Sequence, residues 1–398
     1  MTTRPEGSVG LTGEAGEVWA IVAPALQDGD GPADLAARTY QALQAWPDLP
    51  QDLWAEILGL LPLEDQTRLA RAGHSLHDIL QHLAPQALDP AAHTAPGFIR
   101  TLYTQTELDH SLNPRQWLAF TPGTGSDLTI GHGLAHVHGP GTLTAVKDGH
   151  VTALGDIHIT TVTGGTVLVH DRAAITTVTD GTVYAYGQAT IATVTDGTVY
   201  GDDQTTITTV TGGDVTAENQ ALITTVSGGE VCARDEAAIT TVTSGTVSAL
   251  DQASIGELTG GTVTALDRAS ITTMTGGTVS AGEQAMITTV AGGIVYAIDR
   301  TSIAAVTGGR ITARGNATVT AVAGGTVTAR DNATVTTVGG DAHIVARGNA
   351  QVIIEASAGG ARVDAYDAAD VTADSGTVTV YSPDVTFTGN GGAVIKHA

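Results

Sequence analysis

Histidines are the residues of this chain whose type and spacing come closest to a chemical site. His132, His136, His138, His150, His158 and His170 crowd a short stretch of a chain of 398 residues. Imidazoles on neighbouring turns of a repetitive fold, about 5–10 Å apart, could share a metal ion. The candidate ligands are His136, His138, His150 and His170. The alternative is a solvated, turn-rich face, which the sequence favours, so no cofactor is expected.

The sequence contains no arrangement typical of a catalytic centre. A Ser-His-Asp constellation, a phosphate-binding loop and a dinucleotide fingerprint are all missing. Solenoids that cleave polysaccharides need clustered carboxylates or a basic residue in a groove. The acidic residues here, such as Asp251 and Asp267, instead recur at turns, where Asp favours the required backbone geometry. We therefore expect a protein that is not an enzyme.

Threonine ladders are the most prominent surface feature that the sequence predicts. Thr-Val-Thr or Thr-Val-Ser recurs at 246–248, 262–264, 278–280 and 326–328, and Ile-Thr-Thr runs along the other face. Regular threonine arrays resemble those of ice-binding proteins, but residues such as Asp214, Arg310 and Tyr296 interrupt the columns. The preference of threonine for stacked strands explains the pattern without any ligand.

A sixteen-residue repeat positions all of these side chains. Its second β-branched residue follows eight residues after the first, as in Val167 and Val183. A short and strict period of this kind is typical of a solenoid. The leading Ile or Val of each copy stands at 159, 175, 191, 207, 223, 239, 255, 271, 287, 303, 319 and 335.

Two turns divide each copy into two short strands. Gly-Gly, Asp-Gly or Ser-Gly follows the first strand, as at Gly164-Gly165, and Asp, Asn or Gly follows the second, as at Asp171. These residues accept a positive φ or form Asx turns. The column that begins Val162 and Val178 is never polar, and we expect a bend to turn it inward, since an exposed apolar stripe would promote aggregation.

The predicted fold class is α+β and multidomain, with an N-terminal α-helical module and a long, flattened, single-stranded β-solenoid. The predicted boundaries are 1–46 for N-terminal helices, 47–83 for a three-helix motif, 84–126 for a connector and 127–398 for the solenoid of about sixteen coils. Within the connector, residues 98–108 are expected to be helical and residues 116–120 to form an apolar plug. The repeat is expected to slip by one residue at Asp341-Ala342 and to carry an insertion near residues 357–360.

Composition limits the class of partner. The net charge is −24, with only two lysines, and a strongly acidic surface will not bind nucleic acid through phosphate contacts. The single cysteine, Cys232, argues against a disulfide framework. Neither a secretion signal nor an apolar run of membrane-spanning length is evident, so a cytoplasmic protein without membrane contact is expected.

Residues 47–83 resemble the F-box family. The resemblance lies in Leu49-Pro50, Asp52-Leu53, Glu56-Ile57-Leu58, Leu61-Pro62, Asp65, Leu69, Leu76 and Ile79, and it covers about 35 residues. The chain departs from the family where many members carry a Val-Cys pair and a late Trp. Here Ala72-Gly73 stand at the pair, and no Trp follows Trp54 until Trp117.

The resemblance implies a role in ubiquitin-ligase recruitment. Under it, the helices would dock on a Skp-type adaptor and the solenoid would present a binding surface for a protein substrate. The implied adaptor-binding residues are Leu49, Pro50, Leu53, Ile57, Leu58, Leu61 and Pro62. The repeats look bacterial, so the compartment would be the cytoplasm of a host cell if the protein is an effector.

Two alternatives remain open at this stage. The acidic solenoid could imitate duplex DNA, or it could be a structural scaffold whose helices act only as a cap, because solenoids need a polar-faced terminal unit. The expected helical cap at one end and the polar C-terminal segment at the other count against end-to-end polymerisation. A side-by-side homodimer also remains open.

Overall fold

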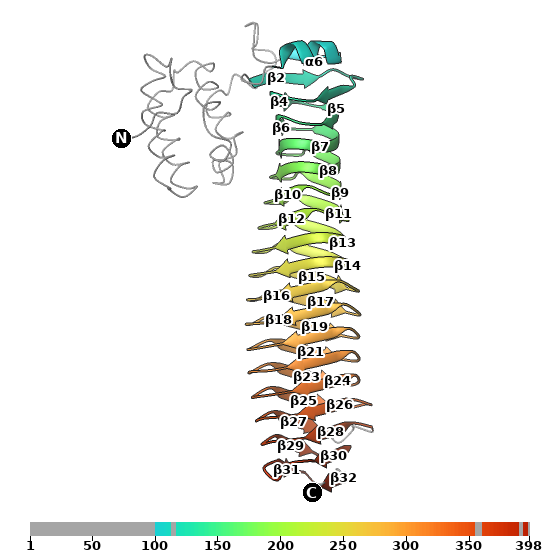
Figure 1. Cartoon of the computed structure of the whole chain (residues 1–398), viewed down its shortest axis with the longest axis vertical. Helices are drawn as coiled ribbons and strands as arrows, with labels where there is room; N and C mark the ends of the chain where they lie inside the picture. Colours follow the sequence, from blue (N-terminus) through green and yellow to red (C-terminus); the bar gives the residue numbers. More distant parts are fainter. Residues whose placement is uncertain (1–99, 113–116, 355–359, 390–392, 397–398) are drawn as a thin grey trace, which may run out of the picture. The chain divides into compact units, whose positions relative to one another are not determined.

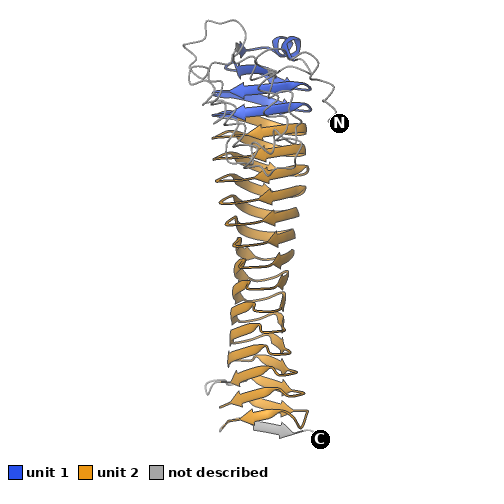
Figure 2. Cartoon of the chain, turned by 90° about the vertical axis from the view of Figure 1, so that its left-hand side faces the viewer, with its two compact units in different colours: residues 1–157 blue, residues 158–398 orange. Residues whose placement is uncertain are grey.

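The described part of the chain is a β-solenoid. The computed structural model describes residues 100–112, 117–354, 360–389 and 393–396, so the N-terminal helices and the F-box-like motif predicted for 1–83 lie outside it. The described residues form about 17 coils of mostly parallel strands, which confirms the solenoid predicted from the repeat (Figure 1). Two compact units divide the chain, residues 1–157 and residues 158–398 (Figure 2).

The first unit contains seven described elements. Their bounds are β1 (Arg100–Leu102), α6 (Gln105–Ser111), β2 (Trp117–Pro122), β3 (Leu128–Ile130), β4 (Leu134–His138), β5 (Gly141–Val146) and β6 (His150–Leu154). One parallel stack consists of β1, β2, β4 and β6, and β3 pairs with β5 in another. Strands therefore begin at Arg100, earlier than the expected start of the solenoid at residue 127.

Helix α6 covers the edge of β3. Thr104 and Glu107 form a capping box at its N-terminus, and Leu108 is fully buried. The Gln105 side-chain amide donates to the Thr129 carbonyl and accepts from the Thr129 N–H, each at 2.7 Å. This pairing satisfies backbone groups that an open strand edge would leave exposed. The helix expected at 98–108 is thus displaced to 105–111, and Phe120 of the expected plug lies fully buried on β2.

The second unit repeats one coil built from two strands. Four long strands turn a corner and serve both halves of their coil: β7 (Ile157–Val169), β8 (Ala174–Ala185), β13 (Leu222–Ala233) and β14 (Ala238–Ala249). The first strands of the other coils are β9 (Thr190–Val194), β11 (Thr206–Val210), β15 (Ser254–Leu258), β17 (Ser270–Met274), β19 (Met286–Val290), β21 (Ser302–Val306), β23 (Thr318–Val322), β25 (Thr334–Val338), β27 (Gln351–Ile354), β29 (Asp370–Ala373) and β31 (Thr386–Thr388). The second strands are β10 (Thr198–Gly201), β12 (Asp214–Ala217), β16 (Thr262–Ala265), β18 (Thr278–Ala281), β20 (Ile294–Ala297), β22 (Arg310–Ala313), β24 (Thr326–Ala329), β26 (His343–Ala346), β28 (Arg362–Ala365), β30 (Thr377–Val380) and β32 (Ala393–Lys396).

Like residues stack on like residues in the core. Val263 pairs with Val279, and Ile271 pairs with Ile287, and all four are fully buried. Each buried Val or Ile side chain contributes about 1.5–3 kcal/mol relative to an exposed one. Small alanines such as Ala269 fill the narrow ends of the core.

The column that contains Val178 is inward, as predicted. In the first strands from β7 to β25 two consecutive residues separate these buried positions, as Thr272 and Thr273 separate Ile271 from Met274. Regular alternation would expose one of the two apolar residues, so the chain bends between them, and both are buried.

The two corners of the coil have different steric requirements. Gly197, after a first strand, has φ 85°, and a Cβ on it would lie 2.7 Å from the Gly181 carbonyl oxygen of the preceding coil. Gly187, after a second strand, has φ 67°, but its nearest neighbour is 3.3 Å away. The first corner therefore accepts only glycine, whereas the second also accepts Asp or Asn with positive φ, such as Asp251 and Asn219.

The repeat slips near its C-terminal end, as predicted. His343 pairs with Thr326, a step one residue longer than the repeat, and Arg362 pairs with His343 after the segment that contains the expected insertion. Thr377 pairs with Arg362 and restores the stack.

The corner geometry predicts opposite outcomes for one substitution at two glycines. Gly197→Asn should destabilise the protein by about 1–3 kcal/mol because the new Cβ meets backbone of the preceding coil. Gly187→Asn places the same side chain in a column that already holds Asn219 and should change stability by less than about 0.5 kcal/mol. Thermal unfolding of both variants checks this, and equal shifts would contradict the proposed difference between the corners.

Candidate protein-binding face

Three columns of outward side chains form one face of the second unit, here called the second-strand face. In each coil they are the first and third residues of the second strand and the residue after its fourth, for example Thr262, Thr264 and Leu266. The lead column is Thr182, Thr198, Asp214, Glu230, Thr246, Thr262, Thr278, Ile294, Arg310, Thr326, His343, Arg362 and Thr377. The middle column is Tyr184, Tyr200, Thr216, Cys232, Ser248, Thr264, Ser280, Tyr296, Thr312, Thr328, Val345, Asp364 and Thr379. The trailing column is Tyr186, Asp202, Glu218, Arg234, Leu250, Leu266, Gly282, Ile298, Arg314, Arg330, Arg347, Tyr366 and Tyr381.

Acidic side chains gather on the early coils of this face. Asp214 and Glu230 lie directly opposite one another on β12 and β13. Like charges at directly opposed strand positions destabilise a sheet. Glu218 has a neighbouring cation, Arg234, at 3.8 Å. Asp202, Asp214, Glu218 and Glu230 are called the acidic segment.

Apolar side chains are exposed in the middle of the face. Ile294, Tyr296 and Ile298 follow one another at the outward positions of one coil, with exposed fractions of 38%, 48% and 44%. Leu266 and Ile298 approach each other across Gly282, since a Cβ on that glycine would lie 3.0 Å from Leu266 Cδ2 and 3.4 Å from Ile298 Cγ1. These exposed residues form an apolar segment on a surface that is otherwise rich in threonine.

Arginines follow the apolar segment. Arg314, Arg330 and Arg347 occupy consecutive coils of the trailing column, and Arg310 lies in the lead column. Within the part of the chain that the structure describes, Arg310, Arg314 and Arg330 form no ion pair. These four residues are called the basic segment.

Aromatic rings end the face beyond the basic segment. The Arg347 guanidinium carbon lies 4.5 Å from the centre of the Tyr366 ring, and the centres of the Tyr366 and Tyr381 rings are 4.5 Å apart. At the opposite end of the face, Tyr184 stacks on Tyr200 with ring centres 4.9 Å apart.

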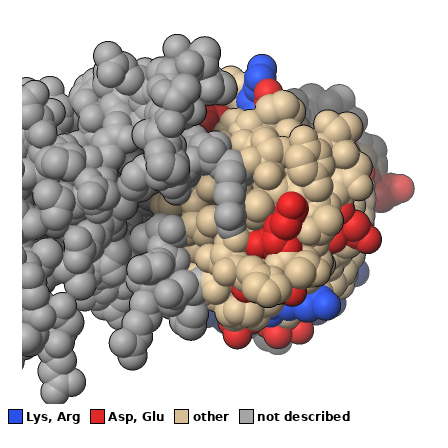
Figure 3. All heavy atoms as spheres, turned by 90° about the horizontal axis from the view of Figure 1, so that it is seen from above, with Lys and Arg blue, Asp and Glu red and all other residues tan. Residues whose placement is uncertain are grey.

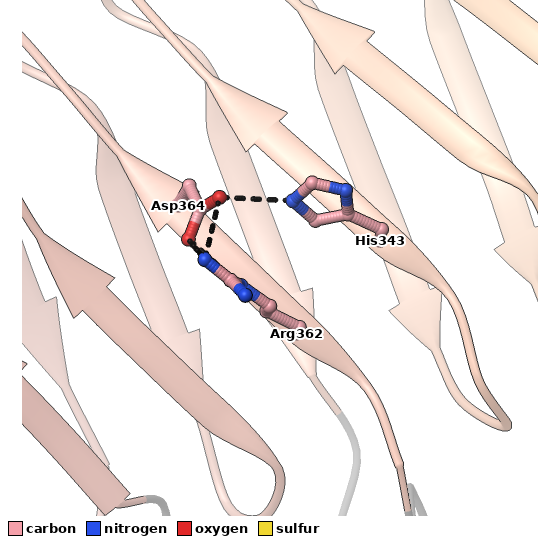
Figure 4. Close-up of polar contacts among 3 residues, drawn as sticks. All are labelled: His343, Arg362 and Asp364. Atoms are coloured by element: carbon pink, nitrogen blue, oxygen red, sulfur yellow. Dashed lines mark hydrogen bonds and ion pairs between the residues drawn. The ribbon is translucent and has the colours of Figure 1, made fainter.

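A polar cluster joins β26 to β28 (Figure 4). His343 Nε2 lies 2.9 Å from Asp364 Oδ2, and Arg362 Nη2 lies 3.1 Å from Asp364 Oδ1. Asp364 is 7% exposed. Burial alone raises the pKa of Asp364, but hydrogen bonds with His343 and Arg362 outweigh it and hold the pKa below its ordinary value of 3.8. Both carboxylate oxygens are therefore engaged, and the contact with His343 joins neighbouring coils, whereas Arg362 lies on the same strand as Asp364.

The candidate metal ligands are only partly brought together. The rings of His136 and His138 lie 6.3 Å apart, but His136 pairs with Thr152, whereas His150 pairs with Leu134 in another column. Burial, with a smaller effect of His138, lowers the pKa of His136 to about 3. His170 is buried against the Tyr186 ring.

The described ranges contain no group of three or more His, Cys, Asp or Glu side chains placed to hold a metal ion. The pair His136 and His138 is thus the closest approach to a metal site among the described candidates.

A polar groove follows the second corner of the early coils. It has a volume of about 780 Å³, and its lining includes Gln188, Asp203, Gln204, Asn219 and Gln220. The lining offers amides and carboxylates but no lysine, arginine or histidine.

Sequence reasoning treated the charged residues of the second-strand face as interruptions of a threonine ladder. The order of these charged residues along the face could have been predicted from the sequence, because successive residues of a column stand sixteen positions apart. An end view of the described surface shows Asp and Glu side chains scattered among uncharged ones (Figure 3). The net charge of the chain therefore does not reveal the order of the charges along the face.

Comparisons with protein-family models, with curated proteins and with solved structures find no match to this chain. The F-box resemblance thus has no support from a family match, and its adaptor-binding residues, from Leu49 to Pro62, lie outside the described residues. None of the helices in the described residues is long and apolar enough to span a membrane.

The polar cluster predicts a pH-dependent contribution to stability. Because the folded-state pKa of Asp364 is depressed, its contribution is present above the ordinary pKa and is lost as the pH falls through the folded value. Asp364→Asn should lower stability by about 1–3 kcal/mol near neutral pH. The difference from the unmodified protein should shrink below pH 3.8.

Thermal midpoints measured across pH check this prediction. Asp370→Asn, an exposed carboxylate on the neighbouring first strand, is the matched control and should leave the midpoint unchanged. A difference for Asp364→Asn that persists at low pH would contradict the assigned role.

Proposed function

We propose that the protein is a non-catalytic interaction protein whose second-strand face binds a protein partner. The observation that supports this most is the exposure of Ile294, Tyr296 and Ile298 together on one coil. Exposed apolar clusters on a soluble surface mark interaction sites. Aromatic side chains and arginine are enriched among the residues that dominate binding energy, and the basic segment adjoins this cluster.

The absence of enzymatic activity is part of the proposal. The His343–Asp364–Arg362 cluster has its carboxylate committed to a histidine and an arginine on the same face, which suits a structural contact. The regular turns account for the Asp residues at the second corner, since Asp251, Asp267 and Asp299 all have φ near 56°.

Adaptor recruitment through the F-box-like residues 47–83 remains the proposed role of the N-terminal part. It rests on the sequence resemblance alone. The alternative is that this part only caps the solenoid. This role is less needed because α6, which lies outside residues 47–83, already covers the edge of β3.

Mimicry of duplex DNA is the second candidate. Acidic residues occupy the second corner on five consecutive coils, Asp235, Asp251, Asp267, Glu283 and Asp299, and hydrogen bonding and repulsion from Asp267 raise the pKa of Glu283. One carboxylate per coil gives a charge about every 4.8 Å, whereas duplex DNA carries one about every 1.7 Å. The corner therefore has about a third of the required charge density, and protein binding is the better proposal.

Site-specific photo-crosslinking tests the proposed face. A photoreactive residue in place of Ser280, exposed beside the apolar segment, should give protein adducts in cells that produce the full chain. The same residue in place of Thr272, exposed on the first strand of the same coil, is the control and should give none. Equal adduct formation at both positions, or none at Ser280, would count against this face.

Adaptor recruitment is tested with the full chain and a recombinant Skp-type adaptor. Capture of the adaptor should be lost in the double variant Leu49→Ala/Pro50→Ala, because both residues belong to the F-box-like contact. Leu222→Ala, an exposed residue of the solenoid, serves as the control and should retain binding. If the unmodified chain captures no adaptor, the helices are left with a capping role.

A further inference from the structure

We propose that the partner of the second-strand face is a second copy of this chain, bound antiparallel about a two-fold axis. The axis runs parallel to the strands and passes between the coil of Thr262 and the coil of Thr278. This inference rests on the proposed protein-binding function of that face and names its partner. It follows from the order of charged, apolar and aromatic side chains along the second unit.

A two-fold axis along the strand direction determines which residues meet. The rotation reverses the order of the coils but keeps each residue in its own column. Each of the six coils of the face on one side of the axis, from Thr262 back to Thr182, then faces its counterpart on the other side, from Thr278 to Arg362. A self-complementary face of this kind is the requirement for an isologous dimer.

The charged residues satisfy this requirement in both outer columns. In the lead column Glu230 faces Arg310 of the second copy. In the trailing column Glu218 faces Arg330, and Asp202 faces Arg347. By symmetry each contact occurs twice, so the dimer pairs the basic segment of each copy with the acidic segment of the other. The pairing compensates Arg310 and Arg330, which form no ion pair within the described part of one chain.

Some apolar and aromatic residues of the trailing column also match under this rotation. Leu250 faces Ile298 in the trailing column, next to the axis, so that the exposed isoleucine gains an apolar neighbour. Leu266 faces Gly282, across which Leu266 and Ile298 of the same chain approach each other. Farther out, Tyr186 faces Tyr366.

Several positions do not match. Ile294 faces Thr246, and Tyr296 faces Ser248. Asp214 faces Thr326.

Arg234 faces Arg314, although Arg234 already has Glu218 at 3.8 Å and donates a hydrogen bond to Cys232 Sγ at 3.2 Å. Glu218 therefore partly offsets the repulsion between Arg234 and Arg314, although the same carboxylate also faces Arg330.

Other arrangements of two copies are less favourable. An axis along the stack of coils places every coil on its own copy and reverses the order of the columns, so that Asp214 meets Glu218 and Arg310 meets Arg314, which is repulsive. A parallel arrangement displaced by seven coils can match acidic with basic segments, but it leaves one segment of each copy unpaired and leads to open filaments. The antiparallel dimer alone pairs both segments and closes.

The available area is adequate for a stable dimer. Twelve coils, from that of Tyr186 to that of Tyr366, extend about 55 Å at ~4.8 Å per coil, and five residues across a strand extend about 16 Å. The face thus offers about 900 Å² per copy, similar to the ~800 Å² of a standard interface.

Thiol crosslinking tests the register with the full chain. In the antiparallel dimer the middle-column Cys232 faces Thr312, while the two Cys232 residues are five coils, or about 24 Å, apart. A short bismaleimide should therefore crosslink Thr312→Cys into a covalent dimer, whereas the unmodified protein should remain uncrosslinked. Thr272→Cys, on the first-strand face, is the control. Crosslinking of the unmodified protein through Cys232 would overturn the antiparallel arrangement.

Charge reversal tests the pairing of the segments. Sedimentation velocity of the purified full chain should show a particle of twice 40.2 kDa in the micromolar range. Glu218→Arg/Glu230→Arg and Arg310→Glu/Arg330→Glu should each be monomeric, with thermal midpoints that show both variants to be folded. An equimolar mixture of the two variants should restore the dimer, because every reversed contact is then opposite in sign.

The possible failures are distinguishable. A monomeric unmodified protein, a dimer that survives either reversal, a mixture that stays monomeric, or an open series of larger species would overturn the proposal. Photo-crosslinks from position 280 to a different protein would in that case leave the proposed protein-binding function intact with another partner. Absence of any adduct would reject both.

Discussion

The stacking of each residue on its equivalent sixteen residues earlier is the constraint on which the rest of this structure depends. Parallel pairing in register keeps Val263 under Val279 and Thr262 beside Thr278, so every column has one environment along its length. The backbone can maintain this register only if both corners accept a positive φ on every coil, and the closer corner admits only glycine because backbone of the preceding coil lies within 3 Å of a Cβ. Core, corner and surface positions are therefore specified separately within one repeat.

This separation explains what the sequence could and could not predict. The period, the two strands per coil, the inward Val178 column and the slip before His343 all follow from residue types that the register constrains. The start of the solenoid was harder, because β1 and β2 lack the repeat, and the Gln105 contact that protects the strand edge depends on a single side chain. Pairing of His150 with Leu134 likewise requires a register that the irregular first coils do not reveal.

The surface carries the information that the repeat leaves unspecified. Because outward positions do not affect the stack, Glu230, Tyr296 and Arg310 can replace threonine at little cost to the fold. Their order along the face is therefore free to serve association, and it is visible only when each column is followed through many coils. The polar cluster around Asp364 is an exception, because it lies on this face and its contacts also stabilise the fold.

The middle coils of the second-strand face, from Thr246 to Gly282, are nearly interchangeable in sequence. Repetitive coding DNA of this kind is prone to unequal recombination, which would add or remove whole coils there. Such a change would alter the length of the molecule in steps of about 4.8 Å and shift the axis of the proposed dimer by half a step, yet it would keep Glu218 and Glu230 opposite the same arginines. The length of the protein could thus vary between lineages while its self-recognition stayed unchanged.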